Sequence, residues 1–96
     1  MKLDFTTNNN TLTVSIEGRL DTISAPELES FLNDKTEGME ALTLECKNLE
    51  YVSSAGLRVL LSAHKKMEGA MKLKNVGELV MEVFEMTGFA DVLVIE

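Results

Sequence analysis

Segments with strand-like and helix-like hydrophobic patterns alternate along this chain, and this alternation limits its possible folds more than any other feature. Apolar and polar residues alternate without a break across residues 11–17, as in a strand with one face on a core and the other in water. Leu28, Phe31 and Leu32 then follow at the spacing of an amphipathic helix. Repeated alternation of this kind predicts an α/β fold whose strands are joined by right-handed crossovers.

The rest of the chain continues this pattern. We expect strands at residues 3–6, 11–17, 41–46, 70–76 and 92–95, and helices at residues 24–37, 54–67 and 78–87. The first two strands form a hairpin, and each later strand is reached through a helix. Half-polar strands indicate that the helices cover chiefly one face of the sheet. We therefore predict one domain, residues 1–96, with a mixed, mostly parallel β-sheet and helices mainly covering one face.

The inward positions of these strands and helices predict one shared core. Its expected members are Leu12, Val14, Ile16, Leu42, Leu44, Leu57, Leu60, Leu61, Leu73, Val83 and Phe84. Ser24 and Glu27 have the spacing of a capping box at the start of the first helix. Gly88 suits the end of the last helix. Cys46 and His64 are interpreted as core residues, the histidine with its hydrogen bonds satisfied.

Four small residues, Ser53, Ser54, Ala55 and Gly56, stand where the central helix begins. A serine there can cap the helix, because its hydroxyl accepts a hydrogen bond from a free backbone N–H of the first turn. The same N–H groups and the helix dipole also favour an anion. Since bulky side chains are absent, the backbone of another molecule could come close. From the residues alone, Ser54 is either a cap or a hydroxyl exposed for modification.

Ser54 shares one face of the expected helix with Arg58, Ser62 and Lys65, which follow at helical spacing. We expect this face to be in solvent, with Arg58 either solvated or in contact with a partner or a phosphate. Asp21 is expected to cap or brace the turn that follows the second strand.

The formal net charge of −7 excludes some partners. A surface this acidic repels nucleic-acid phosphates and anionic lipids, and it suits a partner that carries basic residues. No apolar run is long enough to cross a bilayer, and the start of the chain lacks the apolar centre of a signal peptide. Cys46 is the only cysteine, which favours a reducing compartment. We therefore expect a cytoplasmic protein that binds neither nucleic acid nor a membrane.

Catalysis and metal binding find little support in the sequence. Ser54, His64 and an aspartate would form a hydrolase triad, but no Gly-x-Ser-x-Gly turn is present. On one helix, His64 lies about three turns from Ser54 and on another face, so the two cannot share a hydrogen bond. Cys46 and His64 do not form a metal-ligand cluster, and there is no glycine-rich phosphate loop. We expect no catalytic residue, metal or other cofactor.

Three motifs stand at element boundaries: Gly-Arg-Leu-Asp at 18–21, Tyr-Val-Ser-Ser-Ala-Gly-Leu at 51–57, and Phe-Glu-Met-Thr-Gly-Phe-Ala-Asp-Val at 84–92. They are similar to the Gly-x-Leu/Ile-Asp, aromatic-x-Asp-Ser-Ser/Thr/Ala-Gly-Leu and Phe-x-x-Thr/Ser-Gly-Leu-x-x-Ile motifs of one family. That family is the bacterial anti-sigma factor antagonists, whose fold is the sulphate-transporter and anti-sigma-antagonist (STAS) domain. Order and spacing match over essentially the whole chain, so the resemblance implies a STAS-like fold.

The resemblance also implies a function. In that family, the serine directly after the motif's aspartate is phosphorylated by an anti-sigma factor that is also a serine kinase. The unphosphorylated protein binds that kinase and frees a sigma factor, and a separate serine phosphatase restores the unphosphorylated form. By position, the phosphorylated residue here is Ser54, and Ser53 stands where the family commonly has aspartate. The resemblance places Asp21 near this serine.

We therefore expect a monomeric anti-sigma factor antagonist that phosphorylation at Ser54 switches off. The residues expected to bind the partner are Asp21, Ser53, Ser54, Ala55, Gly56, Arg58 and Ser62, with Lys65 on the same helix face. The alternative is a STAS-domain subunit of a transporter or of a signalling scaffold, which would use the same face without phosphorylation.

Overall fold

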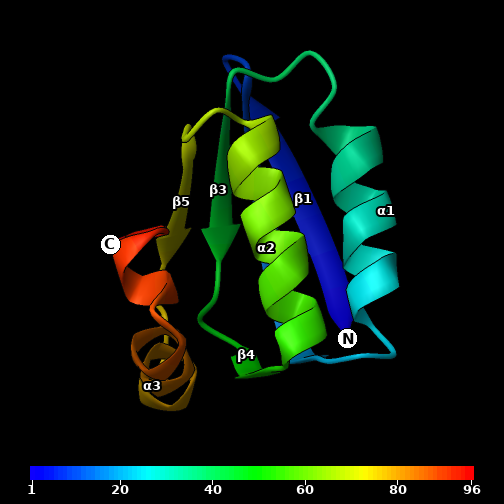
Figure 1. The fold of residues 1–96 in the computed structure, drawn as a ribbon. Coiled ribbons are helices and arrows are strands. Elements are labelled where there is room, and N and C mark those ends of the chain that lie inside the picture. The colour runs from blue at the N-terminus through cyan, green and yellow to red at the C-terminus, as the bar shows by residue number, and fades with distance from the viewer.

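The computed structural model describes residues 1–96 and contains one six-stranded sheet and three α-helices (Figure 1). The strands are β1 (Lys2–Asn8), β2 (Thr11–Leu20), β3 (Ala41–Glu45), β4 (Leu49–Val52), β5 (Met71–Lys74) and β6 (Val94–Ile95). The helices are α1 (Ala25–Lys35), α2 (Ser54–Lys66) and α3 (Glu78–Thr87), and a short 3-10 helix, η1 (Phe89–Asp91), follows α3.

The sheet is mixed and mostly parallel, as predicted. Its strand order is β1-β2-β3-β5-β6, and β4 pairs with the end of β2. Only β1 and β2 are antiparallel, because a tight turn joins them, whereas the other pairs are parallel. α1 and α2 lie side by side on one face of the sheet, and α3 lies at its end, where it packs against β4 (Figure 1). The expected coverage of chiefly one face is confirmed.

Two strand boundaries differ from the prediction at the end that carries the small-residue turn. Residues 18–22 were expected to leave the sheet, but β2 continues to Leu20 through a register shift between Gly18 and Arg19. Gly18 permits this irregularity because its φ is +99°, a value that side chains disfavour. Residues 49–52 were not among the predicted strands, but they form β4. These four residues are in turn buried, exposed, exposed and buried, so they lack the alternation that identifies a strand in a sequence.

Strands β5 and β6 are shorter than predicted. β5 ends at Lys74 because Asn75 adopts a left-handed conformation, with φ of +57°. β6 begins only at Val94, because the backbone N–H groups of Val92 and Leu93 donate to the carbonyl of Phe89 and hold these residues in the η1 turn.

The predicted capping box at the start of α1 is wrong. Ser24 occupies the cap position, but its side chain makes no capping hydrogen bond. Its hydroxyl instead donates to the carbonyl of Arg19 at 2.6 Å and accepts from the backbone N–H of Asp21 at 2.9 Å. The predicted end of α3 is confirmed, because Gly88 is left-handed, with φ of +81°.

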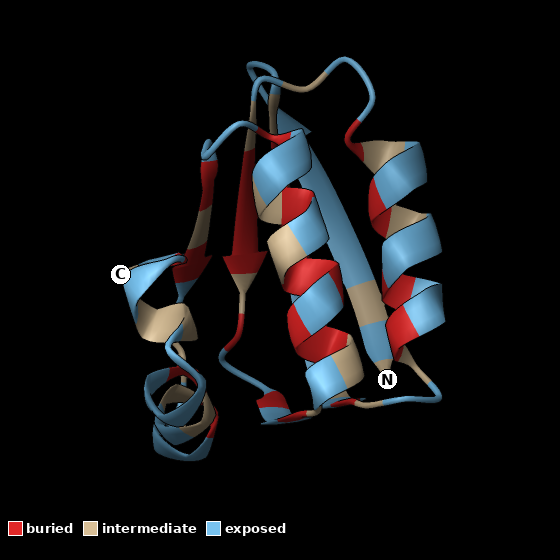
Figure 2. Ribbon diagram, in the orientation of Figure 1, coloured by how far each residue is buried: buried red, intermediate tan, exposed pale blue.

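The core lies between the middle of the sheet and the helices. In Figure 2, β3 is mostly red and β1 mostly pale blue, so the hairpin edge contributes little to it. The predicted core residues are buried except Leu61 and Val83, which are half-buried. Leu61 lies on the side of α2 that no other layer covers, where it lines an open groove. Val83 lies on α3, which packs at the end of the sheet rather than over it.

Cys46 and His64 have different outcomes. Cys46 is buried as predicted, and burial raises the pKa of its thiol to about 12, so the reactive thiolate is absent at neutral pH. His64 is only half-buried, and its buried Nδ1 atom has no hydrogen-bond partner. The prediction of a satisfied core histidine is therefore wrong, because this nitrogen is shielded from solvent and no donor or acceptor lies within hydrogen-bond distance of it.

Candidate functional site

The candidate site lies at the end of the molecule where β2 and β4 both stop. Leu20 pairs with Val52 across these parallel strands, and the backbone N–H of Ser53 donates to the carbonyl of Leu20 at 2.9 Å. The loops that follow the two strands therefore start side by side. Asp21 lies in one loop and Ser53 in the other, and the helices α1 and α2 begin directly after them.

The two serines at the start of α2 have different positions. Ser53 is the cap: its backbone is extended, with φ of −94° and ψ of 176°, and its hydroxyl accepts from the N–H of Gly56 at 3.4 Å. Ser54 is the first helical residue, and its side chain is exposed. The interpretation of Ser54 as the cap is therefore wrong, and the cap role belongs to its neighbour.

Gly56 is buried rather than part of the accessible surface. A Cβ atom at this position would lie 2.7 Å from Cγ of Leu20 and 2.9 Å from its carbonyl oxygen. The small residue is thus required by the fold of this chain, where α2 meets β2. Ala55 is half-buried and remains partly accessible. Of the four small residues, Ser53, Ser54 and Ala55 form the reachable surface, and Gly56 lies beneath it.

Replacing Gly56 with Ala should destabilise the protein. Overpacking of this kind costs about 1–3 kcal/mol, and we expect that cost to exceed the ~1 kcal/mol or less that Ala gains over Gly in a helix. Urea unfolding monitored by circular dichroism would measure the difference. Gly77→Ala is the control for steric overlap, because its new Cβ meets nothing within 4 Å and its cost is limited to that of a poorer cap residue for α3. Equal stability of the Gly56→Ala variant and the parent would contradict this account of the contact.

Asp21 braces the turn between β2 and α1, as one of its two interpretations predicted. Its Oδ1 atom accepts from the backbone N–H groups of Ile23 at 3.0 Å and Ser24 at 3.1 Å. The N–H of Ser24 is the main reason why the pKa of the Asp21 carboxyl lies below its ordinary value of 3.8, and the N–H of Ile23, the Ser24 hydroxyl and the charge of Arg19 add to it. The Arg19 guanidinium lies 3.8 Å from Oδ2 and is largely exposed, so this ion pair adds little stability.

Acid should loosen this turn. Because the pKa of Asp21 is lower in the folded protein than its ordinary 3.8, its contribution is complete above that pH and is lost as the pH falls through the folded pKa. An NMR titration should place the Asp21 midpoint below 3.8, and the amide signals of Ile23 and Ser24 should move with the same midpoint. In the Asp21→Asn variant, the amide signals of Ile23 and Ser24 should no longer move with this titration midpoint. A midpoint at or above 3.8 would contradict the hydrogen bonding described.

The remaining predicted residues lie along α2. Arg58, Ser62 and Lys65 are all exposed, so the expected solvent-facing stripe is confirmed. Neither cation pairs with a carboxylate of the chain. The stripe forms one wall of an open groove of about 630 Å³ between α1 and α2. The groove is lined by Thr22, Ala25, Pro26, Glu29, Ala55, Arg58, Val59, Leu61, Ser62 and Lys65.

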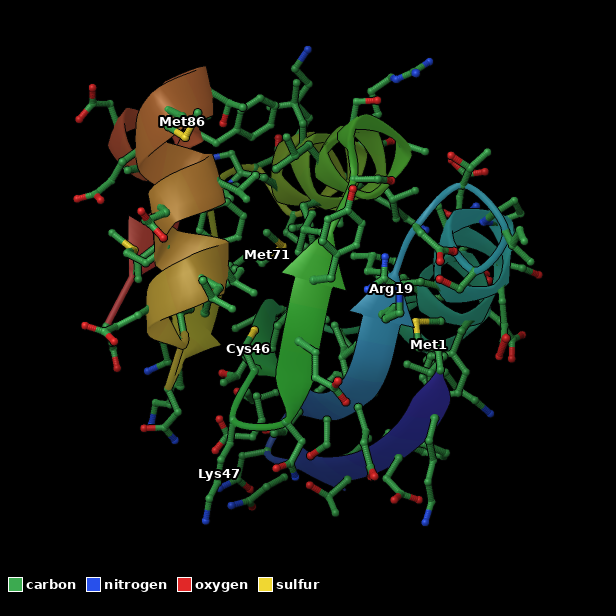
Figure 3. All side chains as sticks on the ribbon, turned by 90° about the horizontal axis from the view of Figure 1, so that it is seen from below. Met1, Arg19, Cys46, Lys47, Met71 and Met86 are labelled. Carbon is green, nitrogen blue, oxygen red and sulfur yellow. The ribbon has the colours of Figure 1, made fainter.

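Sequence patterns assign no role to three further residues at this end of the molecule. Arg19, labelled in Figure 3, places its guanidinium carbon 4.2 Å from the centre of the Tyr51 ring, a cation–π contact between β2 and β4. This contact depends on the pairing of β4, which the sequence did not reveal. Ile23, in the turn that Asp21 braces, is 89% exposed. In the sequence, Ile23 could be singled out only as an apolar residue within a polar turn.

Other kinds of site are not apparent in the structure. No group of three or more His, Cys, Asp or Glu side chains comes together in a way that could hold a metal ion. None of the helices combines the length and the apolar character needed to cross a membrane.

The fold and the arrangement of this end identify the class of protein. The chain belongs to the STAS domain family, whose model matches residues 2–96. It is 33% identical to the anti-sigma-B factor antagonist of Bacillus subtilis, over 97% of this chain and 88% of that relative.

Solved structures agree on the fold. An anti-sigma factor antagonist from Mycobacterium paratuberculosis matches with a TM-score of 0.87 at 21% identity, over 98% of this chain and 83% of that chain. The Bacillus cell fate determinant SpoIIAA in its phosphorylated form matches with a TM-score of 0.74 at 14% identity, over 99% of this chain and 91% of that chain. At these identities, both structures support the fold alone.

Proposed function

We propose that this protein is an anti-sigma factor antagonist. In its unphosphorylated form it binds an anti-sigma factor that is also a serine kinase, and a sigma factor is released. Phosphorylation of Ser54 ends this binding, and a serine phosphatase restores it. Similarity to the anti-sigma-B factor antagonist of Bacillus subtilis supports the general role. The choice of Ser54 as the phosphorylated residue rests on one observation. Ser53 caps α2 with its hydroxyl, whereas the neighbouring Ser54 is exposed.

A phosphate on Ser54 would be tolerated by the fold. It would add about −1.5 to −2 charge at neutral pH. Ser54 is the first residue of α2, where free backbone N–H groups and the positive end of the helix dipole favour an anion. Because the side chain is exposed, the phosphate displaces no core residue. The modification would therefore act on the complex rather than on the folded protein.

The proposed partner surface combines the two loops with the exposed face of α2. It comprises Asp21, Ser53, Ser54, Ala55, Arg58 and Ser62, with Lys65 at its margin and Gly56 beneath it. In this proposal the whole chain acts as a single domain, as a monomer, in the cytoplasm. The monomer can be checked independently by sedimentation equilibrium.

Phosphorylation with a purified kinase tests the proposed residue. Each anti-sigma factor with a kinase domain that the source organism encodes would be incubated with this protein and ATP, and the peptides analysed by mass spectrometry. We expect phosphate on Ser54 in the parent, and none in Ser54→Ala.

Ser53→Ala is the matched control for this experiment. It removes the cap, at a cost of about 0.5–2 kcal/mol, and leaves the proposed acceptor in place, so phosphorylation should persist. Phosphate on Ser53 alone would remove Ser54 from this role. Binding without phosphorylation of either serine would favour the alternative of a subunit that works without a kinase.

A further inference from the structure

We propose that Ile23 is the apolar anchor with which this protein docks on its partner. The side chain is 89% exposed, although it is aliphatic and the turn that carries it is well ordered by hydrogen bonds. Burial of an isoleucine side chain is favourable, and the isolated protein does not gain this stabilisation. The inference rests on the proposed function and names a residue through which it would work.

The turn that carries Ile23 is rigid. The backbone N–H groups of Ile23 and Ser24 both donate to Oδ1 of Asp21. The Ser24 hydroxyl closes the turn by donating to the carbonyl of Arg19. In addition, a β-branched side chain has few rotamers to lose. An exposed apolar side chain on a backbone that is already ordered loses less entropy on binding than one on a mobile loop, which favours its use as an anchor.

The position of Ile23 places it on the proposed partner surface. Its turn begins one residue after Leu20, whose carbonyl accepts from the N–H of Ser53. Thr22, the residue before Ile23, lines the groove that also contains Arg58 and Lys65. A partner that receives Ile23 would therefore cover the start of α2, where a phosphate on Ser54 would obstruct it.

The same surface defines the chemistry of the partner. It should offer an apolar pocket for Ile23, next to carboxylates that face Arg58 and Lys65, because neither cation is paired within this chain. These carboxylates are a local feature, and the net charge of −7 still favours a partner that is basic elsewhere. The occupant that we infer is the anti-sigma factor of the proposed function. The other strongly exposed apolar residues, Leu79 and Met86, lie on α3, and Figure 3 shows Met86 on the opposite side of the view from Arg19. They are therefore suitable controls.

Isothermal titration calorimetry with each purified anti-sigma factor of the source organism tests this inference. Ile23→Ala should raise the Kd by about 10- to 100-fold and Ile23→Asp by more, with unchanged melting temperatures. Ile23→Leu should restore most of the affinity, because only an apolar side chain of similar size is required. Leu79→Ala and Met86→Ala should bind as the parent does.

The outcomes separate this inference from the proposed function. If Ile23→Ala binds like the parent while Ser54→Asp does not bind, the anchor is elsewhere and the proposed function stands. If Ile23→Ala and Met86→Ala lose equal affinity for the anti-sigma factor, then any exposed apolar residue has the same effect on binding, wherever it lies. The inference also fails in that case. If the parent binds none of the anti-sigma factors, the proposed function fails, and the anchor fails with it.

Discussion

Replacing Ser54 with Asp should weaken binding to the anti-sigma factor by at least about 100-fold, while the protein folds normally. The carboxylate stands at the first position of α2, where a negative charge is stabilising by about 0.3–1 kcal/mol, so the melting temperature should not fall. In the complex, a charge and its water would meet a surface fitted to a small hydroxyl. A mismatch of only about 3 kcal/mol corresponds to this loss of affinity.

Two variants make the result specific. Ser54→Ala should bind like the parent, because it adds neither bulk nor charge. Ser30→Asp introduces the same substitution and the same change in net charge at an exposed position on α1, where it lies near Leu3 and Phe31 rather than Ser54. It should bind like the parent as well. Equal losses in Ser30→Asp and Ser54→Asp would show that only overall charge matters. Calorimetry gives the affinity, and circular dichroism gives the melting temperature.

Replacing Leu60 with Ala should produce the largest loss of stability. Leu60 is 1% exposed and packs in the centre of α2 against the sheet, so the change leaves a cavity and costs about 2–5 kcal/mol. The adjacent Leu61 provides a control with the same chemical change on the same helix. It is only half-buried, because it lines the groove, so Leu61→Ala should cost clearly less.

Urea unfolding of both leucine variants measures the two free energies under the same conditions. The difference between them, rather than either value alone, tests which side of α2 faces the core. Equal losses would mean that Leu61 is as well packed as Leu60, contrary to the structure.

The sequence predicted the alternating elements but not the details of the site. Continuous periodicity over residues 11–17 and 78–87 located a strand and a helix, because burial repeats there at a fixed interval. Strand β4 has four residues and no alternation, so its pairing with β2 was not predicted. Without that pairing, the contact of Arg19 with Tyr51 could not be predicted either, since it joins these two strands.

The roles of single residues at the site depended on differences that sequence patterns do not resolve. Ser53 and Ser54 exchange the roles of cap and exposed residue if the helix begins one position later, and helix ends are uncertain by that amount. The burial of Gly56 and the exposure of Ile23 are set by contacts, or their absence, with distant parts of the chain. Small size at position 56 suggested an open surface, whereas its cause was close packing within the protein.

The contact between Gly56 and Leu20 has a consequence for how this protein can evolve. Neighbouring core side chains usually drift together, since a smaller residue at one position makes room for a larger one at the other. Here the obstacle includes the carbonyl oxygen of residue 20, and every amino acid carries one. No substitution at position 20 can therefore compensate for a side chain at position 56. We expect descendants of this sequence to retain glycine at position 56, with no covarying partner.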